Sequence, residues 1–161
     1  MTSPRCDAAF VRHYGGFVRL RVRIDIDADV RRVWDVIEPI EHHVEWMADA
    51  ERIVFTSSRT RGVGTEFECV TKVGPFRTTD VMRVTAWEPR HTMGIEHVGI
   101  VRGTGQFTLR SLRRGRTRFS WSERLQFPWW MGGPIGACFA KPILRRIWRA
   151  NLRRLATICE G

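Results

Sequence analysis

Cysteine is scarce in this 161-residue sequence, and no long apolar run occurs in it. The four cysteines are scattered, with no C-x-x-C pair and no histidines at zinc-finger spacing, so neither a disulfide framework nor a structural zinc site is predicted. The longest nearly uncharged run, residues 127–140, is shorter than the ~20 residues that span a bilayer, and the N-terminus lacks the apolar core of a signal peptide. We therefore expect a cytoplasmic protein without a transmembrane segment.

Lysine is almost absent from a strongly basic chain. The net charge is +10, but only Lys72 and Lys141 among the 27 basic residues are lysine. Clustered basic side chains can bind phosphates by displacing counterions. We attribute the arginine bias to genome composition, and we expect no nucleic-acid partner.

Familiar catalytic motifs are missing as well. The sequence has no G-x-S-x-G nucleophile elbow, no glycine-rich phosphate loop and no H-E-x-x-H metal motif. The stretch "GTGQF" (103–107) has two glycines, but it opens a predicted strand and not a helix. We expect no cofactor, and any catalysis would use acid/base groups and the folding of a reactive substrate in a shaped cavity.

Hydrophobic periodicity predicts a strand followed by a helix near the start of the chain. Residues 18–26 alternate strictly between apolar and charged side chains, which is typical of a half-buried strand. The apolar residues of 30–37 recur at i, i+3, i+4 and i+7, as in an amphipathic helix. Asp27 or Asp29 can cap this helix, and Pro39 ends it.

A second short helix and six strands are predicted next. The helix is indicated by an apolar stripe of Ile40, Val44 and Met47. Residues 51–127 then read as short strands separated by turn signals at 59–62, 73–75, 88–90, 98–100 and 113–115. Connections this short predict an antiparallel meander.

A long amphipathic helix is predicted at the C-terminus, with an apolar stripe that includes Phe139, Ile143 and Ile147 and an arginine-rich opposite side. Pro134 suits its first turn, whereas Pro142 should kink it or mark the start of its main part. The fold class is therefore α+β, with a seven-stranded curved antiparallel sheet wrapped around one long helix and enclosing a cavity. We expect an N-terminal tail at 1–16 and a single domain at 17–161.

Four segments resemble the START-like (SRPBCC) superfamily, which includes the polyketide cyclase/dehydrase and Bet v 1-like families. They are "IDADVRRVWDVI" (26–37), "VEWMADAERI" (44–53), "GRTRFSWSERLQFP" (115–128) and "LRRIWRANLRRLATI" (144–158). The resemblance implies the helix-grip fold. The sequence departs from the usual family pattern at Ala28-Asp29, where family members have Ala-Pro. Members bind hydrophobic molecules in the cavity, and some catalyse cyclisation, dehydration or hydrolysis there.

Strand parity points to candidate catalytic residues. Glu123 shares a strand face with bulky residues such as Phe119 and Trp121, where loss of solvent would raise the pKa of a carboxyl group. Asp80 shares a face with Phe76, Met82, Val84 and Ala86, and His97 shares one with Met93 and Ile95. We interpret Asp80, His97 and Glu123 as a polar patch on an apolar wall. The alternatives are a carboxylate paired with arginine at the cavity mouth and a histidine that only satisfies a backbone carbonyl.

The same parity predicts the residues that bind a ligand. They are Met82, Val84, Met93, Ile95, Phe107, Phe119, Trp121, Phe139, Ile143 and Ile147. Trp129 and Trp130, followed by two glycines, could form a mobile lid over the cavity or pack against the end of the sheet. The apolar stretch 127–140 is either the loop at the cavity entrance or a patch that makes peripheral membrane contact.

The stretch "EHHVEW" (41–46) concentrates histidine and glutamate without predicting a metal site. Adjacent helical residues point about 100° apart, so His42 and His43 cannot serve one metal. His42 and Glu45, at i and i+3, could supply two ligands, but no third is evident nearby. His43 lies beside the apolar stripe, where it would border the cavity.

Two functions remain open from the sequence. The first is a protein that binds a polyketide-like or lipid-like molecule, as an enzyme of the cyclase/dehydratase type. The second is a carrier or regulatory module without catalysis, whose arginine-rich helix meets an acidic partner or a membrane. The oligomeric state, monomer or homodimer, is open too.

Overall fold

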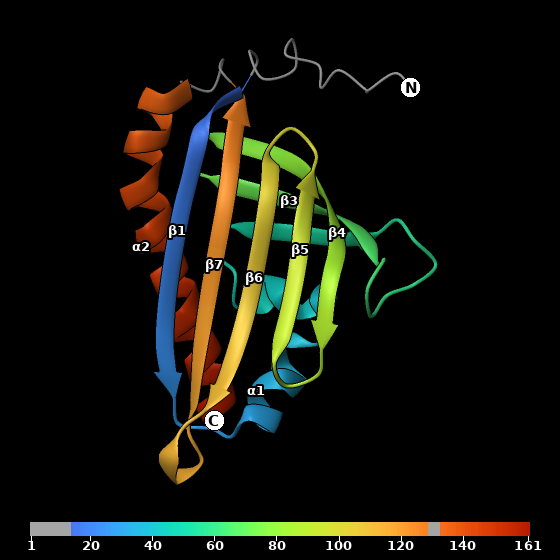
Figure 1. Cartoon of the computed structure of the whole chain (residues 1–161), viewed down its shortest axis with the longest axis vertical. Helices are drawn as coiled ribbons and strands as arrows, with labels where there is room; N and C mark the ends of the chain where they lie inside the picture. Colours follow the sequence, from blue (N-terminus) through green and yellow to red (C-terminus); the bar gives the residue numbers. More distant parts are fainter. Residues whose placement is uncertain (1–13, 129–132) are drawn as a thin grey trace, which may run out of the picture.

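The computed structural model describes residues 14–128 and 133–161. Its main element is a seven-stranded antiparallel sheet (Figure 1). The strands are β1 (Tyr14–Ile26), β2 (Ala50–Phe55), β3 (Glu66–Val73), β4 (Phe76–Glu88), β5 (Thr92–Val98), β6 (Arg102–Ser111) and β7 (Thr117–Pro128). Their order is β1-β7-β6-β5-β4-β3-β2, so the predicted six-stranded meander is confirmed and β1 pairs with its last strand.

Two short helices and one long helix accompany the sheet. They are α1 (Val30–Ile37), the 3₁₀ helix η2 (Ile40–Glu45) and α2 (Gly133–Glu160); a single 3₁₀ turn, η3 (Arg113–Gly115), joins β6 to β7. Of the two possible caps of α1, Asp29 is the one used, because its Oδ1 accepts a hydrogen bond from Arg32 N at 2.8 Å. Helix α2 contains Pro142 in its interior, so its main part does not begin there.

The helical geometry of η2 changes which residues are buried. A 3₁₀ helix has three residues per turn, which places Ile40, His43 and Trp46 on one side, and all three are buried. The sequence analysis assumed 3.6 residues per turn and therefore chose Val44 and Met47, which are only half-buried. The predicted stripe does pack against the core, but His43 and Trp46 are buried more deeply than Val44 and Met47.

The sheet curls around a core that lies on its concave face. In Figure 1, β3 crosses behind β7 and β6, and α2 runs alongside β1. The apolar residues of β1 that the alternation predicted face this core. Trp121 of β7 stacks on Trp148 of α2, with ring centroids 4.6 Å apart, and so fixes the helix to the sheet. The helix-grip arrangement predicted from the sequence is confirmed.

An irregularity in β4 overturns one assignment of strand parity. The pairing with β5 shifts between Val84 and Ala86, as in a β-bulge. The extra residue turns Trp87 toward the core, where its ring meets that of Trp34 edge-on at 5.7 Å. Ala86 therefore does not share the face of Met82 and Val84, as strict alternation predicted. Among the described residues, no helix is long and apolar enough to cross a membrane.

Candidate functional site: an internal cavity with a buried histidine–glutamate pair

A cavity of about 140 Å³ lies between the concave face of the sheet, η2 and α2. Its wall is mostly apolar and comes from strands β2 to β7 and from both helices. The apolar lining residues are Ile40, Met47, Ala50, Ile53, Phe67, Val73, Met82, Met93, Ile95, Phe107, Trp121, Leu144 and Trp148. Such a chamber suits a hydrophobic molecule with a few polar groups.

Asp80, His97 and Glu123 all line this cavity and come from β4, β5 and β7. Each is almost completely buried, with 6%, 8% and 7% of its surface exposed. His97 Nε2 lies 3.3 Å from Glu123 Oε2, across the intervening strand β6. The structure thus brings together the three polar residues that strand parity selected.

One of two glycines of β6, Gly105, makes room for this contact. His97 lies opposite Gly103, and Glu123 lies opposite Gly105. A Cβ atom at residue 105 would come within 2.8 Å of the Glu123 Cδ, which real structures essentially never show. The "GTGQF" stretch, whose glycines were given no functional role from the sequence, therefore forms a notch in the cavity wall at Gly105. The signal was present in the sequence, but its meaning depends on the register of three strands.

Glu123 is held in place by two donors. Trp121 Nε1 donates a hydrogen bond to Glu123 Oε1 at 2.8 Å, and His97 Nε2 meets the other oxygen. A buried carboxylate needs such partners because its transfer from water is otherwise costly. The ring of Trp121 also forms part of the cavity wall, so one side chain both shapes the cavity and orients the carboxylate.

The surroundings of His97 favour its charged form. Burial lowers the pKa of this imidazole, but the hydrogen bond and the charge of Glu123, together with the charge of Asp80, outweigh burial and raise it. The other ring nitrogen, Nδ1, is buried without a hydrogen-bond partner. Burial raises the pKa of Asp80, and the charge of His97 and hydrogen bonds from Val101 N, at 3.5 Å, and the Thr78 side chain offset this only in part.

His43 borders the cavity, as the sequence analysis expected. Its Nε2 lies 2.7 Å from the carbonyl oxygen of Ile37. A carbonyl can only accept, so Nε2 carries the proton and Nδ1 is the acceptor. Burial lowers the pKa of His43 to about 4, which keeps the ring neutral at pH 7. His42 pairs instead with Glu45 on the surface, at 3.3 Å.

No metal site emerges from these groups. Within residues 14–128 and 133–161, no three His, Cys, Asp or Glu side chains are arranged to hold a metal ion. Cys69 lines the cavity, but burial raises the pKa of its thiol to about 11, so it remains protonated and is a poor nucleophile.

The predicted ligand-binding residues fall into three groups. Met82, Met93, Ile95, Phe107 and Trp121 line the cavity. Val84 and Phe119 lie in the packed core with no exposed surface, and Ile147 packs against that core without lining the cavity. Phe139 and Ile143 are 72% and 54% exposed.

Helix α2 faces the cavity with a different side from the one predicted. Leu144 and Trp148 line the cavity in place of the predicted helical residues. Trp148, Leu152 and Leu155 are buried, and packing of these large side chains sets the rotation of the helix. The predicted lid residues Trp129 and Trp130 lie outside the described residues.

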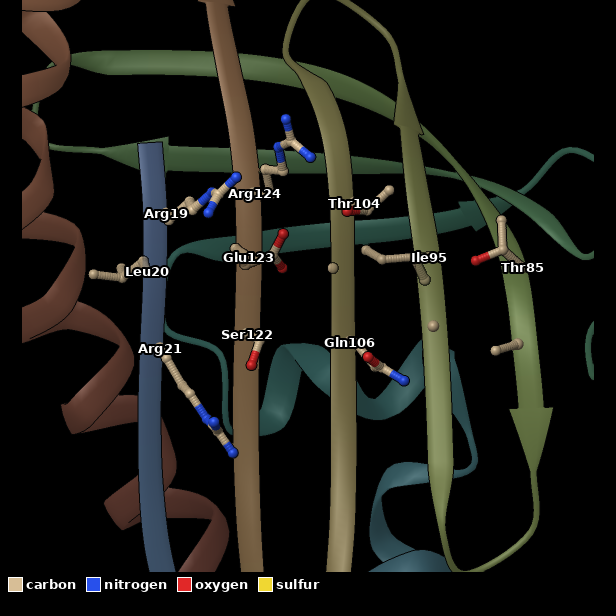
Figure 2. A pocket seen from close by; sticks show the side chains of 13 residues that line it. Arg19, Leu20, Arg21, Thr85, Ile95, Thr104, Gln106, Ser122, Glu123 and Arg124 are labelled. Carbon is tan, nitrogen blue, oxygen red and sulfur yellow. The ribbon is translucent and has the colours of Figure 1, made fainter. Parts of the chain in front are cut away.

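A second hollow lies on the opposite, outer face of the sheet (Figure 2). Its volume is larger, about 520 Å³, and polar and apolar groups line it in nearly equal measure. Arg19, Arg21 and Arg124 line it, together with Ser122 and Gln106. Arg124 rests over the ring of Phe17, 4.0 Å from its centroid. Glu123 borders this hollow as well, but His97 lines only the internal cavity, so the internal cavity is the better candidate for acid/base chemistry.

A curved antiparallel sheet that grips a long helix around a largely apolar cavity defines the helix-grip class of proteins. The chain belongs to the family described as "Polyketide cyclase / dehydrase and lipid transport", whose profile matches residues 18–160. No curated protein matches the sequence.

Several solved structures share this fold. The Zhui aromatase/cyclase from Streptomyces sp. R1128 has a TM-score of 0.72 and 15% identity, over 89% of this chain and 94% of that chain. A protein from Thermus thermophilus has a TM-score of 0.70 and 14% identity, over 88% of this chain and 96% of that one. The di-domain ARO/CYC StfQ from the steffimycin biosynthetic pathway has a TM-score of 0.68 and 14% identity, over 89% of this chain and 49% of that one. At such identities the likeness establishes the fold alone.

Proposed function

We propose that the protein binds a hydrophobic small molecule of polyketide or lipid character in the cavity and acts on it as a cyclase or dehydratase. The observation that carries this proposal is the His97–Glu123 pair, 3.3 Å apart and buried in an otherwise apolar wall. Ionisable groups held together out of water are typical of acid/base catalysis. Membership of the cyclase/dehydrase family and the aromatase/cyclase neighbours support the same function.

The pair can complete a dehydration without an external acid or base. The Glu123 carboxylate takes a proton from the carbon next to a substrate carbonyl, and the His97 imidazolium gives a proton to the leaving hydroxyl, which departs as water. A proton then passes from Glu123 to His97 across their 3.3 Å contact and restores the starting state. Asp80 stabilises the imidazolium, since its charge raises the pKa of His97.

A carrier without catalysis is the second candidate. The wall of the cavity is mainly apolar, and a protein that only stores or moves a hydrophobic ligand needs little more. The family description includes lipid transport, which supports this alternative. In a carrier, His97 and Glu123 would orient one polar group of the ligand and would transfer no proton.

Native mass spectrometry tests whether the cavity binds a ligand. The protein is incubated with an organic extract of its source organism, alongside two variants of α2. We expect an adduct on the wild type and none on Leu144→Trp, because Leu144 lines the cavity and a larger ring would fill it. Ile143→Trp is the matched control, since Ile143 is exposed and its replacement leaves the cavity open. An adduct on all three proteins, or on none, would contradict the proposal.

The same experiment with Glu123→Gln separates an enzyme from a carrier. An enzyme that has lost its base retains the substrate, whereas the wild type holds product. The ligands released from the two proteins then differ in mass by one water, or in chromatographic retention if the reaction is an isomerising cyclisation. Identical ligands would favour the carrier. A cytoplasmic location and a monomeric or dimeric state remain parts of this proposal, and cell fractionation and sedimentation would test them.

A further inference from the structure

The internal cavity carries charge of the opposite sign to the protein as a whole. The chain has a net charge of +10, yet among the described residues no arginine or lysine lines the cavity, whereas Asp49, Asp80 and Glu123 all do. The arginines near the middle of the sheet lie on its outer face instead, around the second hollow (Figure 2). A cluster of three carboxylates inside so basic a chain indicates a preference for a particular kind of ligand.

The carboxylates outnumber every cation that faces them. Among the described residues that line the cavity, His97 is the one basic residue whose charged form is favoured. It supplies one positive charge beside Asp80 and Glu123. His43 is neutral at pH 7, because burial lowers its pKa to about 4. Asp49 accepts a hydrogen bond from the uncharged amide of Asn151, at 2.6 Å. An anionic ligand would therefore meet like charge in a buried site, which costs free energy.

The aromatic wall adds to the preference for positive charge. Phe67, Phe107, Trp121 and Trp148 line the cavity beside the carboxylates. The face of an aromatic ring attracts a cation, most strongly where water is excluded. Asp80 accepts one long backbone hydrogen bond, at 3.5 Å, and one from the side chain of Thr78, and its two carboxylate oxygens have lone pairs left to accept from an ammonium group.

The size of the cavity limits the part of the ligand that it encloses. Its volume is about 140 Å³. A cavity of about 150 Å³ holds a benzene ring, and pockets for drug-sized ligands are on the order of 300–1,000 Å³. One ring with a short substituent therefore fits, whereas several fused rings do not fit the enclosed space.

We propose that the cavity selects a ligand whose enclosed end is a single ring bearing a positively charged amine, and that it rejects the matching carboxylate. This inference deepens the proposed function and rests on it, since it names the class of ligand for the same cavity. Glu123 and Asp80 are the residues that bind the ammonium group, and the aromatic rings cover the remaining surface of the ligand.

Three probes of nearly equal size test this selection. They are 2-phenylethylamine, 2-phenylethanol and 3-phenylpropanoate, which are cationic, neutral and anionic at pH 7. Isothermal titration calorimetry should give an affinity for the amine at least about tenfold above that for the alcohol, with the carboxylate weakest. Leu144→Trp should abolish binding of the amine, and any carboxylate binding that survives in this variant belongs to the arginine-lined outer hollow.

Variants of the carboxylates assign the charge effect to named residues. Glu123→Gln and Asp80→Asn should each reduce the ratio of the amine affinity to the alcohol affinity by about tenfold. Glu68→Gln is the matched control, because Glu68 lies on β3 between Phe67 and Cys69 and does not line the cavity. Circular dichroism checks that each variant is folded.

The outcomes separate this inference from the proposed function. Suppose that the alcohol binds and that Leu144→Trp abolishes this binding. If the amine then binds no tighter than the alcohol, or the carboxylate binds best, the charge selection is wrong. The proposed ligand cavity would still be supported. If none of the three probes binds and no adduct forms with the extract, the proposed function fails and the inference fails with it. An unchanged preference in both Glu123→Gln and Asp80→Asn would also overturn the inference.

Discussion

At the scale of single residues, the site depends on how Glu123 and His97 modify each other. Glu123 is buried, yet both of its oxygens have a donor, one from Trp121 and one from His97. His97 is buried, yet its pKa is raised, because two carboxylates face it. Strand parity in the sequence predicted that these residues share the inner face. The 3.3 Å contact could not be predicted, since it depends on the register of β5, β6 and β7.

Removing the charge of Glu123 should lower the pKa of His97. In Glu123→Gln the burial of the imidazole remains, and burial favours the neutral form. A pH titration of the ring nitrogens by NMR should place His97 above the ordinary histidine pKa of 6.5 in the wild type and lower in the variant. Glu68→Gln should leave the titration of His97 unchanged. Equal pKa values for His97 in the wild type and Glu123→Gln would contradict the proposed coupling.

His43 should make the protein less stable in acid. Its pKa is about 4 in the folded protein, below the ordinary value of 6.5, so the unfolded chain binds the proton more tightly. Its contribution is therefore complete above pH 6.5 and is lost as the pH falls toward 4, by about 3 kcal/mol. Urea unfolding at pH 7 and pH 4 measures this loss.

The matched variant for His43 is His43→Gln. A glutamine amide can still donate to the Ile37 carbonyl but does not titrate. Its free energy of unfolding should fall less between pH 7 and pH 4 than that of the wild type, by about the 3 kcal/mol assigned to His43. Parallel losses in the two proteins would show that His43 is not buried in its neutral form.

At the scale of elements, strand β6 contributes to the site through a glycine, whose missing side chain leaves space for Glu123. Gly103 is paired with His97 and Gly105 with Glu123, but only Gly105 leaves space for the carboxylate. Their surroundings differ. A Cβ on Gly105 would meet the side chain of Glu123, whereas a Cβ on Gly103 would meet the backbone of Arg124, and Gly103 has φ of +145°. A side chain can move aside, but a paired strand cannot.

The two glycine substitutions should therefore have different effects. Gly105→Ala should displace the Glu123 carboxylate, lower the pKa of His97 and weaken ligand binding while the protein remains folded. Gly103→Ala should destabilise the whole fold, by more than about 3 kcal/mol, through the backbone clash and the strained φ. Thermal unfolding and the NMR titration of His97 measure the two effects. A Gly105→Ala protein with an unchanged His97 titration would contradict the proposed role of the notch.

Asn151 links α2 to the segment that follows η2. It has no exposed surface, its Oδ1 accepts from Ala48 N at 3.1 Å, and its Nδ2 donates to Asp49. Asn151→Ala leaves buried groups without partners and should cost about 1–3 kcal/mol in the free energy of unfolding. Thr157→Ala, on the exposed side of α2, should cost less than about 0.5 kcal/mol. Similar losses from both variants would argue against this link.

At the scale of the whole molecule, periodicity predicted the fold better than it predicted the cavity. The short connections between the later strands were sufficient for the order of β2 to β7, whereas the pairing of β1 with β7 was not predicted. The cavity wall depends on features that periodicity does not report. The bulge in β4 turned Trp87 into the adjoining core and left Ala86 on the other face, and packing of α2 placed Leu144 rather than Ile143 in the cavity wall. In each case the inward-facing position shifts by about one residue along the chain, so a different side chain points inward.

The internal cavity is the proposed ligand-binding site of the whole molecule, and the methionines of the cavity wall offer the most direct test. Met47, Met82 and Met93 all line the cavity, from different elements of the fold. With methyl-¹³C methionine, NMR spectra are recorded while the ligand identified by native mass spectrometry is added. The three methyl signals should shift together and saturate at one ligand per chain, and they should not shift in Leu144→Trp. A ligand that binds the wild type without moving any of these three signals would place the binding site elsewhere and contradict the account.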